Sequence, residues 1–183
     1  MAVKVLPKRL SENKEFLDRF YREGRAAARL NHSNIVQAID GLKVYRWVFY
    51  KSPEVLRGFR EESYRRFLAD YDSGRGKRYV FGRLPTLPFA EDRFQLALVS
   101  YLLFVYEDQL SYEFHKQSIR EIMRVTSGEA RIYPLVTFEA KRSQYLDPLR
   151  DDPDLRHLRF ALVPTDFEFL ANSNTYMSIR QSL

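Results

Sequence analysis

The sequence predicts an α/β protein with a mostly parallel sheet. The first observation is the apolar run 94–106, in which Gln95 and Ser100 are the clearly polar members. A short apolar run between polar turns is typical of a strand that is buried on both faces. The second observation is an amphipathic helix expected over 112–124, followed by a strand over 130–138. A strand, a helix and another strand in this order favour parallel pairing through a helical crossover.

The chain ahead of this strand predicts a second helix and two short strands. An aromatic strand is expected from Val44, and Ser52 is a good N-cap for a helix that begins at Pro53 and ends near Tyr71. A strand over 79–81 then leads into a stiff connection that contains two prolines. The outer face of the helix carries four arginines, for which a solvated face is the favoured interpretation and an anion or RNA contact the alternative. They are Arg57, Arg60, Arg65 and Arg66.

The chain after residue 140 predicts a weaker helix and a closing strand pair. The helix is expected over 143–157 and is interrupted by Pro153. The remaining residues read as two strands around the turn 172–174, which pair antiparallel. In the helix over 112–124, Ser111 is the expected N-cap, and His115 falls on the apolar stripe, where a packed histidine is favoured over a general base.

Composition limits the classes of function. The chain has 183 residues and 45% hydrophobic residues, enough for one folded domain or two unequal pieces. The net charge of +6 permits contact with nucleic acid, but a basic solvated surface is the favoured interpretation. There is no cysteine, and the three histidines are widely spaced, so no metal site is expected. No apolar run is long enough for a membrane span and no signal pattern opens the chain, so the cytoplasm is the expected compartment.

One family resemblance rests on LPTLPFAEDRFQLALVSYLLFVYEDQL and EFHKQSIREIMRVTSGEARIYPLV. These stretches resemble the second half of a class I S-adenosylmethionine-dependent methyltransferase, and more closely a family of bacterial and plant methyltransferase-like proteins. The resemblance covers about 44–183. It implies an incomplete Rossmann-like, class I methyltransferase-type sheet with flanking helices and a C-terminal antiparallel strand pair. It also implies a transferase activity, in which a methyl group is transferred from S-adenosylmethionine.

The resemblance also implies site residues at the carboxyl ends of the strands, where open α/β sheets bind ligands. Leu84 and Pro85 would flank the adenine, while Ser100 and Tyr101 would lie near the cofactor or the substrate. A rigid turn packed on the core is the alternative for Leu84 and Pro85. The family's aspartate is Gln95 here and its histidine is Tyr101, so neither a carboxylate nor an imidazole base stands at these positions.

The family's Gly-rich cofactor loop has no counterpart ahead of residue 44, and neither has the acidic residue that would bind the ribose. The sequence therefore predicts a methyltransferase-like protein that is inactive as a lone chain. Its catalytic residues and its methyl acceptor stay unassigned.

Residues 1–40 carry a different resemblance. A strand over 2–6 and a helix over 12–30 with Ser11 as its N-cap are expected. AVKVL with EFLDRFYREGRAAARLNHSNIVQAID resembles the N-lobe of a bacterial serine/threonine protein kinase. In that family the residue at Lys4 holds the ATP phosphates and pairs with the residue at Glu23. No Gly-rich loop, HRD-type loop, DFG or APE motif accompanies them. An ordinary strand–helix ion pair is thus favoured over ATP and Mg²⁺ chemistry.

Three alternatives to methyl transfer remain open. The chain could act as a non-catalytic binding or scaffold module, as an ATP-binding remnant of the kinase-like piece, or be a non-folding relic. A sheet edge left exposed by missing strands would also favour a homo-oligomer.

Overall fold

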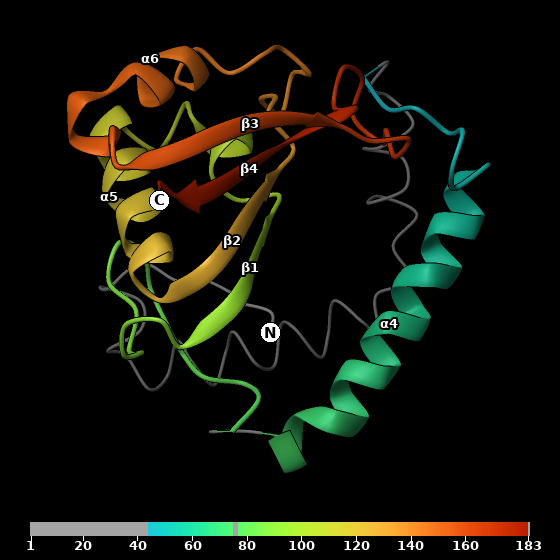
Figure 1. The fold of residues 1–183 in the computed structure, drawn as a ribbon. Helices are drawn as coiled ribbons and strands as arrows, with labels where there is room; N and C mark the ends of the chain where they lie inside the picture. Colours follow the sequence, from blue (N-terminus) through green and yellow to red (C-terminus); the bar gives the residue numbers. More distant parts are fainter. Residues whose placement is uncertain (1–43, 75–76, 183) are drawn as a thin grey trace. The chain divides into compact units, whose positions relative to one another are not determined.

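The computed structural model describes residues 44–74 and 77–182. These residues fall into two compact units: one holds 44–49 and 84–182, the other 50–74 and 77–83. The two units are described separately below (Figure 1). The strand and helix expected within 1–40 lie outside the described residues, as do the side chains of Lys4 and Glu23.

The larger unit is built on an open, mixed four-stranded sheet. Its strands are β1 (Phe94–Ser100), β2 (Thr126–Tyr133), β3 (Leu158–Pro164) and β4 (Thr175–Gln181), and their order is β1-β2-β4-β3 (Figure 1). β1 and β2 pair parallel, whereas β4 pairs antiparallel with both β2 and β3. Three strands therefore run one way and β4 runs the other. The predicted α/β class and the C-terminal antiparallel pair are confirmed, but the sheet predicted to be mostly parallel is mixed, with one parallel and two antiparallel strand pairs.

Helix α5 (Tyr112–Arg124) forms the crossover between β1 and β2. The Ser111 hydroxyl accepts a hydrogen bond from the backbone N–H of Phe114 at 3.2 Å, as expected of an N-cap. The helix packs against β2 and β4 through a buried stripe at three-to-four spacing. That stripe consists of His115, Ser118, Ile119, Ile122 and Met123. The local sequence thus sets both the start of α5 and the face it buries.

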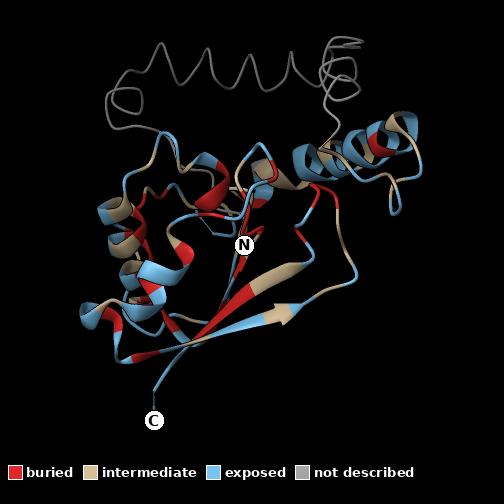
Figure 2. Ribbon diagram, turned by 90° about the horizontal axis from the view of Figure 1, so that it is seen from above, coloured by how far each residue is buried: buried red, intermediate tan, exposed pale blue. Residues whose placement is uncertain are grey.

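The core lies between one face of the sheet and the helices next to it. Ala130, Ile132, Met177 and Ile179 alternate along β2 and β4 and are at most 1% exposed. Figure 2 shows buried residues along these strands and on the neighbouring helices. The short helix α6 (Leu146–Asp151) and the 3₁₀ helices η1 (Phe104–Tyr106) and η2 (Pro153–Leu155) add further leucines and Phe104. The weaker helix predicted over 143–157 is therefore two shorter pieces that meet at Pro153.

The apolar run 94–106 is not one central strand. β1 ends at Ser100, because Tyr101 has a φ of 52° and leaves the extended conformation. Among the described strands β1 lies at an edge of the sheet, and Leu96 and Leu98 are 46% and 63% exposed. The run is so apolar because its second part turns into the core as η1. The prediction of a strand buried on both faces is wrong for this reason.

Three other predicted strands differ from the observed backbone. β2 begins at Thr126 and ends at Tyr133, before Pro134, which has no N–H to continue the ladder. The strand expected from Val44 is a single antiparallel bridge between Tyr45 and Leu170. Residues 79–81 form no strand, because Tyr79 belongs to an isolated bridge. The aromatic composition of these two segments reflects ring packing and not a ladder of backbone hydrogen bonds.

The smaller unit consists of α4 (Pro53–Gly74) and the turn that follows it. The Ser52 hydroxyl accepts from the Val55 N–H at 3.3 Å, so the predicted N-cap is correct. The arginine-rich face is engaged in short-range ion pairs of 2.8 Å or less, a result that favours a solvated face. The pairs are Arg57–Glu61, Arg65–Glu62 and Arg66–Glu62. Among the helices described, none has the length and apolarity needed to cross a membrane.

Candidate functional site

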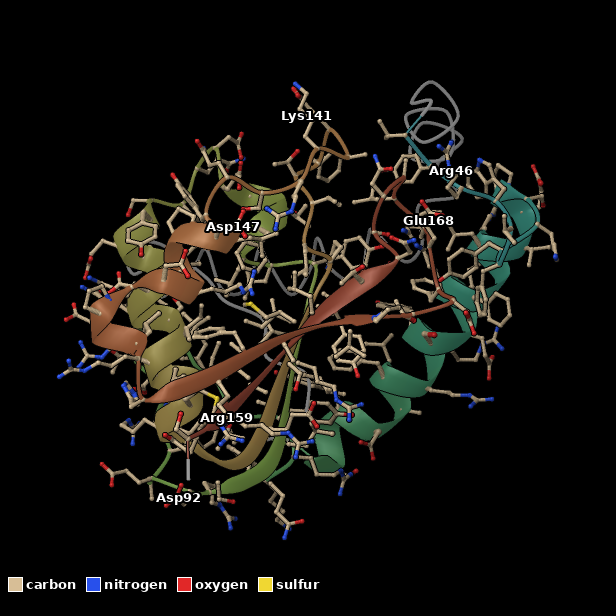
Figure 3. The ribbon with its side chains drawn as sticks, turned by 45° about the horizontal axis from the view of Figure 1, so that its top comes forward. Arg46, Asp92, Lys141, Asp147, Arg159 and Glu168 are labelled. Carbon is tan, nitrogen blue, oxygen red and sulfur yellow. The ribbon has the colours of Figure 1, made fainter. Side chains whose placement is uncertain are left out.

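The two ends of the parallel strand pair present different surfaces. β1 has 7 residues, which span about 20 Å, so its ends are well separated. Figure 3 places Lys141 and Glu168 at one end of the sheet and Asp92 and Arg159 at the other. The first end is the carboxyl end of β1 and β2, where α/β proteins commonly bind ligands. It is the first candidate site.

Tyr101 marks the carboxyl end of β1. Its φ of 52° lies in the left-handed region, which is costly for a residue with a large side chain. Its backbone N–H donates to the Tyr133 carbonyl at 2.8 Å, and this bond continues the pairing of the two strands. The rings of Tyr101 and Tyr133 meet edge to face, with centroids 5.7 Å apart. The strained backbone therefore fixes the Tyr101 ring directly beyond the exposed side chain of Ser100.

Tyr133 is the second side chain of this site. Its hydroxyl lies 2.8 Å from the Ser173 Oγ and donates to the Phe167 carbonyl at 3.4 Å. Ser173 is 1% exposed and donates to the Leu170 carbonyl at 2.7 Å, so the pair is held from the loop after β3. Burial raises the pKa of the Tyr133 phenol, which therefore stays protonated at neutral pH. Tyr133 can position a ligand but cannot serve as a base there.

An aromatic cluster extends this end of the sheet. Residues 44–49 run beside the loop after β3, because the Arg46 N–H donates to the Phe169 carbonyl at 2.7 Å and the Ala171 N–H to the Val44 carbonyl at 2.6 Å. Ring contacts with centroid distances between 4.7 and 6.3 Å join this segment to Tyr133 through Phe167. We use "aromatic cluster" for Tyr45, Trp47, Phe49, Phe167 and Phe169.

Polar contacts tie the remaining loops of the carboxyl end together. The Ser143 hydroxyl donates to the Glu107 carboxylate, and the Asn172 side chain donates to the Ala140 carbonyl at 3.1 Å. Ala140 and Asn172 have φ values of 59° and 65°. Two loops that are far apart in sequence are therefore joined by the bond between Asn172 and Ala140, with left-handed backbone on both. A concentration of such conformations is a recognised mark of functional sites.

The predicted residues Leu84 and Pro85 lie at the opposite end. The connection that contains them follows the last turn of α5, where the Leu87 N–H donates to Glu121 at 2.6 Å and Arg124 donates to the Phe89 carbonyl at 3.0 Å. Leu84 is only 5% exposed, which favours the rigid-turn interpretation of this segment. Pro85 lines a cleft of about 550 Å³ between the connection, α5 and the residues where β3 begins and β4 ends.

The four residues expected to share a cofactor site are therefore not brought together. Ser100 and Tyr101 stand at the carboxyl end of β1, whereas Leu84 and Pro85 stand at its amino end. The expectation of one shared edge is wrong, because contacts with α5 direct the connection toward the start of β1. Sequence reasoning also missed Tyr133 as the partner of Tyr101, and Ser173 as the partner of Tyr133. Tyr133 could have been noticed because Pro134, within the strand predicted over 130–138, has no N–H for the ladder and so marks Tyr133 as the strand's last residue.

His115 is a packed residue of the core. It is 0% exposed, its Nδ1 lies 2.9 Å from the Ser111 carbonyl oxygen, and its ring contacts those of Phe104 and Tyr145. The favoured interpretation of His115 is confirmed. Within 44–74 and 77–182, no group of three or more histidine or acidic side chains could hold a metal ion.

Comparison with known proteins gives one relative of unknown activity. The chain is 32% identical over 137 residues to an uncharacterised protein of the archaeon Methanocaldococcus jannaschii. The match covers 75% of this chain and 59% of that protein, so the chain spans less than two thirds of its relative's length. No protein-family model matches the chain, and no solved structure matches it significantly.

Proposed function

We propose that this chain takes part in S-adenosylmethionine-dependent methyl transfer as the second half of a Rossmann-like, class I methyltransferase-type domain. One observation carries the proposal: the order β1-β2-β4-β3, in which β4 alone runs against the others. A closing antiparallel strand pair of this kind is what the resemblance to class I methyltransferases implies. The motif resemblance over 44–183 supports the same assignment independently.

The proposed cofactor contact lies beyond the carboxyl ends of β1 and β2. Of the residues that the resemblance implied, Ser100 and Tyr101 belong to this contact, and Tyr133 is added to them. Leu84 and Pro85 do not belong to it. Ser100 is exposed and is the last residue of β1 that pairs with β2, so its hydroxyl is available to a ligand beyond the strand end. Tyr101 is held by its backbone bond to Tyr133 and by the edge-to-face contact of the two rings.

Methyl transfer depends more on the orientation of the two reactants than on proton transfer. A lone pair of the acceptor forms a bond to the methyl carbon while the carbon–sulfur bond breaks, so the sulfonium becomes the neutral thioether of S-adenosylhomocysteine. Holding the two reactants in line supplies most of the rate enhancement expected of such a site. The Tyr101 ring can face the sulfonium cation and stabilise it by a cation–π contact. Tyr101 stands where the related family has a histidine.

The affinity of the lone chain for cofactor is expected to be low. The described residues contain no Gly-rich loop after a first strand, and such a loop holds the methionine part of the cofactor in this class. β1 is the edge to which further parallel strands would be added among the strands described. We therefore expect measurable binding of S-adenosylhomocysteine but no turnover by the chain alone.

Isothermal titration calorimetry and thermal melts of the full chain with S-adenosylhomocysteine test this proposal. A ligand in hundredfold excess over its dissociation constant should stabilise the folded state by about 2.7 kcal/mol. Tyr101→Gly removes the ring but keeps a residue suited to positive φ, and it should abolish the stabilisation. Asp92→Gly is the matched control, because Asp92 also has a positive φ, of 52°, but precedes β1. Equal responses of the two variants, or no response of the parent chain, would refute the proposal.

A non-catalytic binding module is the second candidate, and the edge position of β1 favours it. Leu96 and Leu98 are exposed on one face of that strand, and unpaired strand edges commonly recruit another strand. Size-exclusion chromatography with light scattering would show a defined dimer if β1 pairs with a second copy. The kinase-like alternative makes a separate prediction: ATP with Mg²⁺ should bind, and Lys4→Ala should remove that binding.

A further inference from the structure

We infer that the cleft at the amino ends of β1 and β2 is a second binding site, which accepts the carboxylate or phosphate group of a small organic anion. The cleft has a volume of about 550 Å³. Small-molecule sites in proteins commonly enclose roughly 300–1,000 Å³. It lies at the end of the strands opposite Ser100 and Tyr101, so this inference is independent of the proposed methyl transfer.

The wall of the cleft is a fixed and electrically neutral frame. Arg124 donates to both carboxylate oxygens of Glu121 at 2.8 Å, and Glu121 also accepts from the Leu87 N–H at 2.6 Å. The Arg124 guanidinium holds the pKa of the Glu121 carboxyl below its usual range, so the pair stays ionised and mutually neutralised. Arg124 donates further to the Phe89 carbonyl at 3.0 Å. The connection and α5 are thereby joined before any ligand arrives.

The polar side chains that face the cleft are not used in this frame. Arg120, His157 and Gln181 line it, and none of the three has a side-chain partner within the described part of the chain. Because Glu121 is neutralised by Arg124, the Arg120 charge is left uncompensated among the lining residues. Among the described lining residues, the cleft therefore combines the unpaired guanidinium of Arg120 with an imidazole and an amide that can donate hydrogen bonds, while the carboxylate of Glu121 is already paired.

The negative end of α5 does not oppose an anion strongly here. Helix C-termini disfavour anions through their unpaired carbonyl groups. In α5 the carbonyl of Glu121 accepts from the Val125 N–H at 3.2 Å, and that of Arg124 accepts from the Asp92 N–H at 3.0 Å. The Val125 carbonyl accepts from the Phe94 N–H at 2.9 Å. These bonds engage three of the carbonyls at this end of α5 and reduce its negative character, so the guanidinium of Arg120 is the main electrostatic feature of the cleft wall.

The residue types define the class of ligand. A guanidinium presents a planar fork of N–H donors that matches the oxygens of a carboxylate or a phosphate. The imidazole and the amide can donate to the remaining oxygens, and Pro85 and Met123 offer apolar surface to the uncharged part of the ligand. Two probes represent the two sources of the anionic group: glycerol 3-phosphate carries a phosphate, and succinate carries carboxylates.

Calorimetric titration of the full chain with each of these probes tests the inference, with sodium chloride added to equalise ionic strength. Saturable binding of either probe is the expected result, and the probe that binds identifies the source. Arg120→Ala should weaken binding about tenfold or more, because a charge-assisted bidentate contact is lost. Arg120→Lys should recover only part of it, since an ammonium lacks the fork.

Arg60→Ala provides the matched control. Arg60 is an exposed arginine on α4, also without a side-chain partner in the described structure, and it does not line the cleft. This variant loses the same charge and should bind as the parent does. The inference is overturned if neither probe saturates, or if Arg120→Ala and Arg60→Ala have equal affinities. S-adenosylhomocysteine binding should not change in Arg120→Ala, so failure of one proposal does not imply failure of the other.

Discussion

The two ends of the parallel strand pair differ in whether their side chains already make hydrogen bonds and ring contacts within the protein. At the carboxyl end, Tyr101 and Tyr133 are locked by backbone hydrogen bonds, ring contacts and the buried Ser173. At the amino end, an ion pair on α5 fixes the wall of a cleft, while Arg120 and His157 remain without side-chain partners within the described residues.

This difference separates two kinds of binding surface. The carboxyl end is preorganised, and its strained backbone at Tyr101 is maintained by the surrounding packing. At the amino end, the residues that form the wall of the cleft are not the residues that are proposed to bind the ligand. A ligand bound there would contact side chains that make no side-chain hydrogen bond or ion pair within the described residues. Substitutions on α5 and β2 test whether the two ends are supported independently.

Gly128→Ala should disrupt the amino end most. A Cβ at Gly128 would stand 2.2 Å from the carbonyl oxygen of Gln95, at the point where the register between β1 and β2 shifts. We expect a loss of about 3 kcal/mol in the free energy of unfolding, measured by urea denaturation, because backbone must move. Gly58→Ala is the control: nothing lies within 4 Å of its Cβ, and it should be neutral or slightly stabilising.

Glu121→Ala should loosen the frame of the cleft. It removes the acceptor of the Leu87 N–H and both contacts to Arg124. We expect a loss of about 2 kcal/mol, because charge-assisted hydrogen bonds of a largely buried carboxylate disappear. Hydrogen exchange should speed up at Leu87 but not at Tyr101. Equal acceleration at both amides would show that the two ends are coupled.

Tyr133→Phe should affect only the carboxyl end. The ring contacts remain, whereas the hydrogen bonds to Ser173 and Phe167 are lost. A loss of about 1 kcal/mol is expected for a partly buried hydroxyl of this kind. Binding of S-adenosylhomocysteine should weaken, and binding of glycerol 3-phosphate at the cleft should be unchanged. A change at the cleft would contradict the separation of the two sites.

Glu129 on β2 is tested by a pH titration of stability. Hydrogen bonds from Arg131 and Ser178 lower the pKa of this carboxyl to about 2. A carboxyl with a lowered pKa stabilises the fold above its unfolded pKa of about 4.3, and the contribution is lost as the pH falls toward 2. Glu129→Gln should therefore flatten the stability curve between about pH 5 and pH 2. An unchanged slope in that range would contradict this assignment.

The parts of the fold that the sequence predicted are those set by local chemistry. Ser111 caps α5 and Ser52 caps α4, because a side-chain hydroxyl followed by helical periodicity is a local signal. The antiparallel pair at the end of the chain was readable from the turn residues around Ser173. The α/β class followed from the order of these elements, without knowledge of any long-range contact.

The parts that could not be predicted depend on long-range contacts. The connection with Leu84 and Pro85 follows α5 because Leu87 bonds to Glu121, a residue 34 positions away. The apolar run 94–106 had the composition of a buried strand, but η1 within it supplies the core and Leu98 remains exposed. The pairing of Tyr101 with Tyr133 depends on the register of β1 and β2, which no local pattern specifies.

The most direct test of the central claim is a backbone amide NMR titration of the full chain with S-adenosylhomocysteine. The account predicts saturable chemical-shift changes at Ser100, Tyr101 and Tyr133, with the amides of Arg120 and His157 unmoved. Changes confined to Arg120 and His157, or no saturable change at the carboxyl end, would contradict the claim that this end of the sheet is the cofactor surface.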